Sequence, residues 1–155
     1  MNLTDGLDGL AASNMIVSLA ACTIICILMG NIDIAIISAA IAGATMGFLY
    51  FNKYPAKVFM GDTGSLAIGG FVAASAVVSG CELYILIVGF IYLAEVLSVI
   101  LQVSYFKATP GKRLFKMAPI HHHFERCGNS ETRIVTAFTI ITALLAALGI
   151  IGIWA

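Results

Sequence analysis

Charged residues are scarce in this sequence. Only 10% of its 155 residues are Asp, Glu, Lys or Arg, and 61% are hydrophobic, whereas a soluble domain has about 25% charged and about 45–50% apolar residues. So few charges cannot cover the surface of a water-soluble globule, which excludes a soluble enzyme, a disordered tail and a protein that binds nucleic acid. The formal net charge is zero, so no overall field attracts an anionic partner. The composition therefore predicts an integral membrane protein.

Cysteine pairs with the spacing of metal ligands are also absent. The sequence has four cysteines but no Cys-x-x-Cys pair, which gives no support to a zinc site or a redox motif. Cys22 and Cys26 lie four residues apart in an apolar run, so they share one helix face as small packing residues. We expect all four cysteines to be structural.

Long apolar stretches are abundant. A membrane-spanning helix needs about 20 mostly apolar residues. Five stretches approach this length, at approximately residues 10–30, 34–50, 66–78, 83–105 and 134–154. Each is expected to be a helix, because a strand exposed to lipid would leave its backbone groups without hydrogen bonds. We predict an all-α, polytopic transmembrane protein of about five spans that forms a single domain over residues 1–155.

Basic residues are confined to two long polar connections. All eight lie within residues 52–65 and 107–133, and the positive-inside rule places both connections in the cytoplasm. Five spans bring residues 2–9 to the same membrane face. The basic stretch at residues 107–116 suits contact with anionic lipid headgroups or a phosphorylated lipid. Any chemistry is therefore expected at the cytoplasmic surface.

The first polar segment carries two carboxylates. Asp5 and Asp8 are three residues apart, so one helical turn would direct both side chains the same way. Such a pair suits a divalent cation or a basic group. The alternative is helix capping by Thr4 or Asp5. The neighbouring glycines let a backbone approach a ligand closely, which favours the functional interpretation.

The second polar segment is FMGDTGS at residues 59–65. At a helix N-terminus it offers backbone N–H donors for phosphate, and Asp62 offers a carboxylate for Mg²⁺. It is not a P-loop, because the Lys-Ser/Thr ending is absent. The alternative is a glycine turn with a capping Asp or Thr. Phe59 could stack on a flat ring or serve only as an interfacial anchor.

The third polar segment holds His121, His122 and His123. Neighbouring helical residues differ by about 100°, so at most two of these side chains can meet one ligand. They suit metal binding, phosphate binding or proton transfer, and the alternative is a solvated cluster. Glu95 lies inside the fourth apolar stretch with Gln102 seven residues on. An intramembrane carboxylate is a functional candidate, although a hydrogen-bonded packing role stays open.

These motifs together resemble a known family. NLTDGLDGLA, VFMGDTGSLA and APIHHHFE, in this order and alternating with apolar stretches, are similar to the bacterial phospho-N-acetylmuramoyl-pentapeptide transferase family of the polyprenyl-phosphate N-acetylhexosamine-1-phosphate transferases. The resemblance covers essentially the whole chain. It implies Mg²⁺-dependent transfer of phospho-MurNAc-pentapeptide from its UDP carrier to undecaprenyl phosphate, giving lipid I and UMP at the cytoplasmic face of the bacterial inner membrane.

The resemblance also implies residue roles. Asp62 would hold Mg²⁺, and Asp5 would belong to the acidic catalytic cluster. His121 would be the first candidate for catalysis, with the other two histidines beside it over the pyrophosphate. Phe59 would stack on the uracil. The remaining substrate-binding set comprises Asn2, Gly6, Leu7, Asp8, Asn52, His122 and His123.

One part of the family pattern is missing from this sequence. The family carries an adjacent Asp-Asp pair and a basic active-site residue in its N-terminal half, and this sequence has no Asp-Asp pair. We therefore expect the chain to match the C-terminal half and to need the N-terminal half, or another copy, for activity. A homodimer stays open. The alternatives are a UDP-GlcNAc-type transferase and a non-catalytic membrane protein, such as a transporter that uses Glu95 and the histidines for ion passage.

Overall fold

The computed structural model describes residues 1–154, and the regular structure in this range is helical. A short 3-10 helix, Asn2–Thr4, precedes α1 (Leu10–Leu28), α2 (Ile32–Asn52), α3 (Gly61–Ser79), α4 (Glu82–Val88), α5 (Phe90–Ala108), α6 (Ile120–Arg126) and α7 (Glu131–Trp154). Within these residues, five helices are long and apolar enough to cross a membrane: α1, α2, α3, α5 and α7. The predicted all-α, polytopic class is confirmed.

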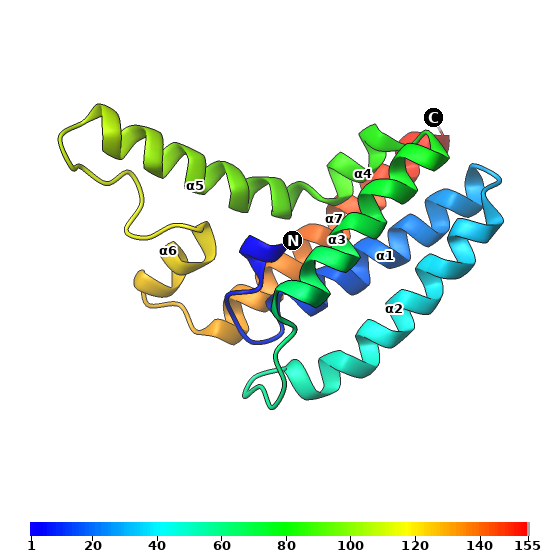
Figure 1. Cartoon of the computed structure of the whole chain (residues 1–155), viewed down its shortest axis with the longest axis horizontal. Helices are drawn as coiled ribbons and strands as arrows, with labels where there is room; N and C mark the ends of the chain where they lie inside the picture. Colours follow the sequence, from blue (N-terminus) through cyan, green and yellow to red (C-terminus); the bar gives the residue numbers. More distant parts are fainter. Residues whose placement is uncertain (155) are drawn as a thin grey trace.

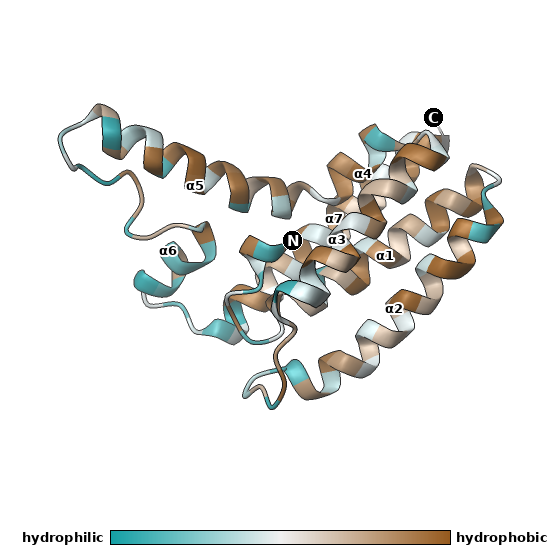
Figure 2. Ribbon diagram, in the orientation of Figure 1, coloured by the Kyte–Doolittle hydropathy of each residue, from teal (hydrophilic) through white to brown (hydrophobic). Residues whose placement is uncertain are grey.

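Helix α1 forms the centre of the bundle. It packs against α2 and α7 and also contacts α3 and α4 (Figure 1). Of its apolar span 61% is buried, against 22–28% for the other four spans. A helix that is apolar on all sides belongs in the interior. The other spanning helices are largely apolar along their length (Figure 2). They carry exposed apolar side chains such as Ile36 and Leu144, which are suited to lipid.

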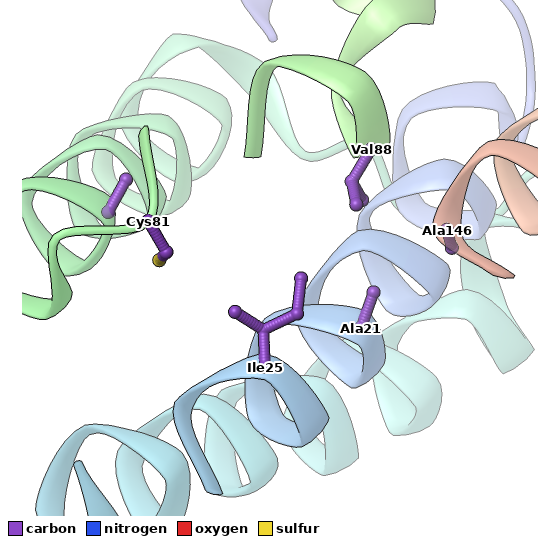
Figure 3. Packing of buried hydrophobic residues seen from close by; sticks show 6 residues of the cluster. Ala21, Ile25, Cys81, Val88 and Ala146 are labelled. Carbon is purple, nitrogen blue, oxygen red and sulfur yellow. The ribbon is translucent and has the colours of Figure 1, made fainter. Parts of the chain in front are cut away.

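A cluster of buried residues, several of them small, packs α1 against α4 and α7. Figure 3 shows Ala21 and Ile25 of α1 close to Cys81, Val88 of α4 and Ala146 of α7. Close backbone approach of this kind is the usual basis of helix packing in membranes. Three cysteines are buried, as expected for packing residues, whereas Cys127 is exposed.

A buried polar link fixes α1 against α7. The Thr142 hydroxyl donates a 2.5 Å hydrogen bond to Asn14 Oδ1, and the Asn14 amide donates to the Leu10 carbonyl at 2.8 Å. Both side chains are fully buried. Interhelical hydrogen bonds of this type set the register of helices in an apolar environment.

The fourth apolar stretch is interrupted, which corrects the expectation of one continuous span over residues 83–105. Helix α4 ends at Val88 and α5 begins at Phe90. The chain turns at Gly89, where a side chain would lie 3.0 Å from the carbonyl oxygen of Ile85; a sharp change of helix direction is commonly found at such a glycine. Helix α4 packs on α7, while α5 leaves the bundle and approaches α6 (Figure 1).

Two further boundaries differ from the expected ones. Helix α3 begins at Gly61 rather than near residue 66, so Asp62 lies in its first turn. The connection over residues 107–133 contains α6, a two-turn helix that carries the three histidines. Both differences place motif residues at helix N-termini, where local hydrogen bonding rather than apolar content determines the boundary.

Candidate functional site

Two polar segments are joined by hydrogen bonds at one end of the bundle. The carboxylate of Asp8 accepts a 2.8 Å hydrogen bond from the N–H of Ala56, and that of Asp5 accepts one of 3.2 Å from Gly61. The Ser65 hydroxyl donates to Asn2 Oδ1 at 3.1 Å. Residues 2–9 are thereby fixed to the α2–α3 connection and to the start of α3.

The histidine segment meets the same end. Helix α6 packs against α5 and α7, and the His121 imidazole lies against Gly6 so closely that a side chain at that position would collide with Nε2. Hydrophilic residues gather in this region (Figure 2). These contacts bring the three polar segments together at one end of the bundle, as their predicted common membrane face requires.

Asp5 and Asp62 form an acidic pair beside the N-terminus of α3. Asp62 is exposed, whereas Asp5 is half-buried. Burial raises the pKa of Asp5 above its ordinary value, and the charge of Asp62 raises it further, against the opposing effect of the Gly61 N–H. Two carboxylates that repel one another are stabilised by a cation placed between them.

The acidic pair fits a magnesium ion that is shared with a substrate. Mg²⁺ in phosphate-handling sites takes one or two carboxylates and completes its shell with phosphate oxygens and water. Among residues 1–154, no group of three or more His, Cys, Asp or Glu side chains is arranged to hold a metal alone. Asp5 and Asp62 match the one or two carboxylates that such a site uses.

The α2–α3 connection presents an aromatic ring. The Phe59 side chain is 73% exposed, so its faces are open to a flat ligand. Asn52 is only 3% exposed and donates a 2.9 Å hydrogen bond to the carbonyl of Val58. The structure thus places Asn52 behind this connection as a brace rather than on its open side.

The other residues expected to bind substrate take different positions. The Leu7 side chain is buried and packs with Leu10, Ile91 and Phe138. Asn2 and Asp8 are engaged in the hydrogen bonds that join the segments. Together these residues shape the loop around Gly6.

The three histidines turn to three different partners. His121 faces Glu95 of α5, His122 Nδ1 lies 2.9 Å from Glu125 Oε2, and His123 Nδ1 accepts a 3.1 Å hydrogen bond from the N–H of Lys116. The rings of His121 and His122 are neighbours, with centroids 4.2 Å apart. The geometry agrees with the expectation that at most two of them can meet one ligand, and His123 is the one turned away.

Glu95 has a partner that its sequence position did not indicate. Its Oε2 lies 3.0 Å from His121 Nδ1, and the two side chains are 0% and 1% exposed. On the same helix, Gln102 Oε1 accepts a 2.8 Å hydrogen bond from the N–H of Phe115. The sequence features that could have indicated this pair were the intramembrane carboxylate and the histidine cluster. Their pairing depends on the turn at Gly89, which the sequence pattern did not show.

A cavity of about 400 Å³ lies between α5 and the α5–α6 connection. Val99, Val103 and Phe106 line its apolar part, and Lys107 and Arg113 bring positive charge to it. An apolar cavity with two cationic residues suits a molecule with an apolar chain and an anionic head.

Comparison with known proteins gives a family match and close relatives. Residues 1–80 match the model of glycosyl transferase family 4. The chain is 56% identical over 155 residues to the phospho-N-acetylmuramoyl-pentapeptide-transferase of Clostridioides difficile (strain 630). It is 54% identical over 153 residues to the protein of that name from Clostridium botulinum (strain Eklund 17B / Type B), and 53% over 155 residues to that from Bacillus mycoides (strain KBAB4).

The matched relatives are longer than this chain. Each comparison covers 99% of the chain but only 47–48% of the relative. The chain therefore spans about half the length of the curated relatives that it matches.

Proposed function

Because this chain belongs to glycosyl transferase family 4, we propose that it provides the metal- and nucleotide-binding face of a membrane transferase. The reaction is transfer of phospho-MurNAc-pentapeptide from its UDP carrier to undecaprenyl phosphate, giving lipid I and UMP. The observation that carries the proposal is the meeting of Asp5, Asp62 and His121 from three separate segments at one end of the bundle. The names of the close relatives agree with this reaction.

Mg²⁺ is the proposed cofactor, held by Asp62 with Asp5 beside it. The ion supplies positive charge to the pyrophosphate, and phosphoryl transfer depends on such charge stabilisation and on positioning. Burial raises the pKa of Asp5, and the charge of Asp62 adds to this, so a cation bound beside the two carboxylates would offset both effects. The N-terminus of α3 adds partial positive charge toward phosphate oxygens.

The donor nucleotide is placed beside the same helix N-terminus. Phe59 stacks on the uracil with its exposed ring, and Gly6 and Leu7 offer backbone groups. Asn2, Asp8 and Asn52 hold this surface in shape through hydrogen bonds. His121 and His122 face the pyrophosphate, with His123 in a supporting position.

The lipid acceptor is assigned to the cavity beside α5. Its apolar wall suits the first part of a polyprenyl chain, and Lys107 and Arg113 suit the phosphate. All eight basic residues lie within residues 52–65 and 107–133, which supports a cytoplasmic active site in the cell membrane by the positive-inside rule.

The proposed transferase activity needs a second half of the protein in addition to this chain. The relatives are about twice as long, and the resemblance assigns an Asp-Asp pair and a basic residue to their other half. We expect activity when that half is supplied, and none from this chain alone.

The test is Mg²⁺-dependent UMP release from membranes that contain the chain together with the remaining half of the C. difficile relative. The substrates are UDP-MurNAc-pentapeptide and undecaprenyl phosphate, with UDP-GlcNAc as the competing donor. Asp62→Asn is expected to abolish release. Asp33→Asn is the matched control, because Asp33 is also exposed in the first turn of a helix but lies at the opposite end of the bundle.

Three results would contradict the proposal. Absence of UMP release with both halves present would favour a non-catalytic membrane protein. A preference for UDP-GlcNAc would show that the donor is UDP-GlcNAc rather than UDP-MurNAc-pentapeptide. UMP release by this chain alone would show that the other half is not needed.

A further inference from the structure

Glu95 and His121 bring a carboxyl group and an imidazole together in the interior of the protein. The atoms Oε2 and Nδ1 are 3.0 Å apart, and neither side chain is exposed by more than 1%. The distance is that of an ion pair, but the two atoms lack the alignment of a hydrogen bond. Catalytic hydrogen bonds are often misaligned without substrate and become aligned when it binds.

The outer atoms of this pair have no protein partner. Glu95 Oε1 and His121 Nε2 are both buried, and neither makes a hydrogen bond within the described residues. Nε2 is directed at Gly6, where a side chain would collide with it. One ring nitrogen therefore faces a carboxylate, and the other faces the loop that also carries Asp5.

Packing alone does not account for the pair. Apolar side chains of similar size would fill the same space without burying unpartnered polar atoms, and a buried ion pair is often no more stabilising than such a replacement. An unpartnered nitrogen in a buried ring is instead the arrangement expected of a group that receives a ligand or a proton.

We propose that Glu95 is a positioning residue that fixes the orientation and the tautomer of His121, so that Nε2 faces the loop at Gly6. A carboxylate only accepts hydrogen bonds, so the nitrogen that faces it, Nδ1, carries the proton. In the neutral ring Nε2 then holds the lone pair. This inference rests on the proposed function, which places the pyrophosphate at that loop.

The arrangement gives Nε2 a defined task. It accepts a proton from a phosphate hydroxyl, which leaves a phosphate oxyanion, and as N–H it then donates to a phosphate oxygen. A base whose second nitrogen is oriented by an acidic residue is a recurring arrangement in enzymes. Glu95 acts in this step only through His121.

The chain offers a matched pair for comparison. Glu125 lies 2.9 Å from His122 Nδ1, but these side chains are 42% and 24% exposed and belong to the same helix, α6. Glu125→Gln and Glu95→Gln therefore make the same chemical change at the same distance from an imidazole, in water and in the interior respectively.

The direct experiment is nitrogen NMR of the chain labelled with ¹⁵N-histidine, in vesicles of phosphatidylethanolamine and phosphatidylglycerol. The sequence has only three histidines, and loss of signal in His121→Gln assigns the ring of interest. We expect a protonated Nδ1 and an unprotonated Nε2 for His121. In Glu95→Gln both tautomers should appear, since an amide can accept or donate, whereas Glu95→Asp should retain the original signals in part. Glu125→Gln should leave the His121 signals in place.

Kinetics supply the second readout, with the other half of the relative present. Glu95→Gln is expected to lower kcat about 10- to 100-fold, as loss of an orienting partner does, with KM for the donor changed by less than about 3-fold. Glu95→Asp is expected to recover part of the lost kcat. A purely structural role would reduce the amount of folded protein without this split.

The outcomes separate the two proposals. Unchanged His121 signals in Glu95→Gln overturn the positioning role, whatever the activity. A changed KM with an unchanged kcat overturns it too. The expected NMR change together with no transferase activity in the unsubstituted protein would support the orientation of His121 and overturn the proposed function instead.

Discussion

Two adjacent histidines in α6 each lie beside a glutamate, at 3.0 Å for His121–Glu95 and 2.9 Å for His122–Glu125. The first pair is buried and the second is open to water. An exposed ion pair contributes about 0–1 kcal/mol, whereas removing one partner of a buried pair costs about 3–5 kcal/mol. The exposure of such a contact to water, rather than the distance between its atoms, therefore determines its contribution to stability.

The two pairs also arise differently from the fold. Glu125 is three residues from His122 on one helix, so local geometry alone brings them together. Glu95 reaches His121 only because the chain turns at Gly89 and α5 approaches α6. The buried pair is thus a product of the tertiary structure, and it should respond to changes that leave the exposed pair unaffected.

The largest expected effect is that of Glu95→Ala. It opens a cavity and leaves a buried ring nitrogen of His121 without a polar partner, and we expect a loss of about 3–5 kcal/mol in the free energy of unfolding. The measurement is denaturant unfolding in detergent, followed by the helical circular dichroism signal, with Glu125→Ala as the control. Equal losses in the two variants would contradict the distinction between them.

The next effect is that of Gly6→Ala. The added methyl group collides with His121 Nε2, and overpacking of this kind costs about 1–3 kcal/mol. We also expect UMP release to fall, because the ring is displaced from the loop. Gly43→Ala is the control, since a side chain there meets nothing within 4 Å. A Gly6→Ala protein with unchanged release and stability would show that the ring does not lie against this loop.

A buried hydrogen bond between an uncharged hydroxyl and an amide should have a smaller effect than the contact between Glu95 and His121. Thr142→Val keeps the size of the side chain but removes the hydroxyl that donates to Asn14, and we expect a loss of about 1 kcal/mol. The measurement is the same unfolding transition, compared with Thr136→Val on the exposed side of α7. A loss as large as that of Glu95→Ala would contradict a larger contribution from the Glu95–His121 contact.

The smallest effect is expected for Glu125→Gln. This exposed pair contributes less than about 1 kcal/mol, so the stability should change little. High salt should reduce even this small difference, because water and ions screen the contact. A stabilisation that persists at high salt would indicate that the pair is shielded from solvent.

Much of the fold follows from the sequence, because membrane spans are defined by long apolar runs. The shared face of the three polar segments could also be predicted, from the position of the basic residues and the number of spans. The turn at Gly89 could not, since a glycine between apolar residues is common in continuous membrane helices. Consequently the partner of Glu95 was also missed.

The predicted site residues also differ in how well their positions could be predicted from the sequence. Asp5, Asp62 and Phe59 were predicted as site residues from their chemistry, and the structure leaves their side chains at least partly accessible. The resemblance implies that Asn52 and Leu7 bind substrate, but their side chains are buried. Sequence identifies polar and apolar types, whereas the direction of a side chain depends on the packing of several segments.

The most direct test of the account is the rate of UMP release by Glu95→Gln and Glu125→Gln, measured side by side with the other half of the relative present. The account predicts a kcat about 10- to 100-fold lower for Glu95→Gln, with a much smaller change for Glu125→Gln. Equal rates in the two variants would contradict the claim that the buried glutamate positions His121 for the reaction.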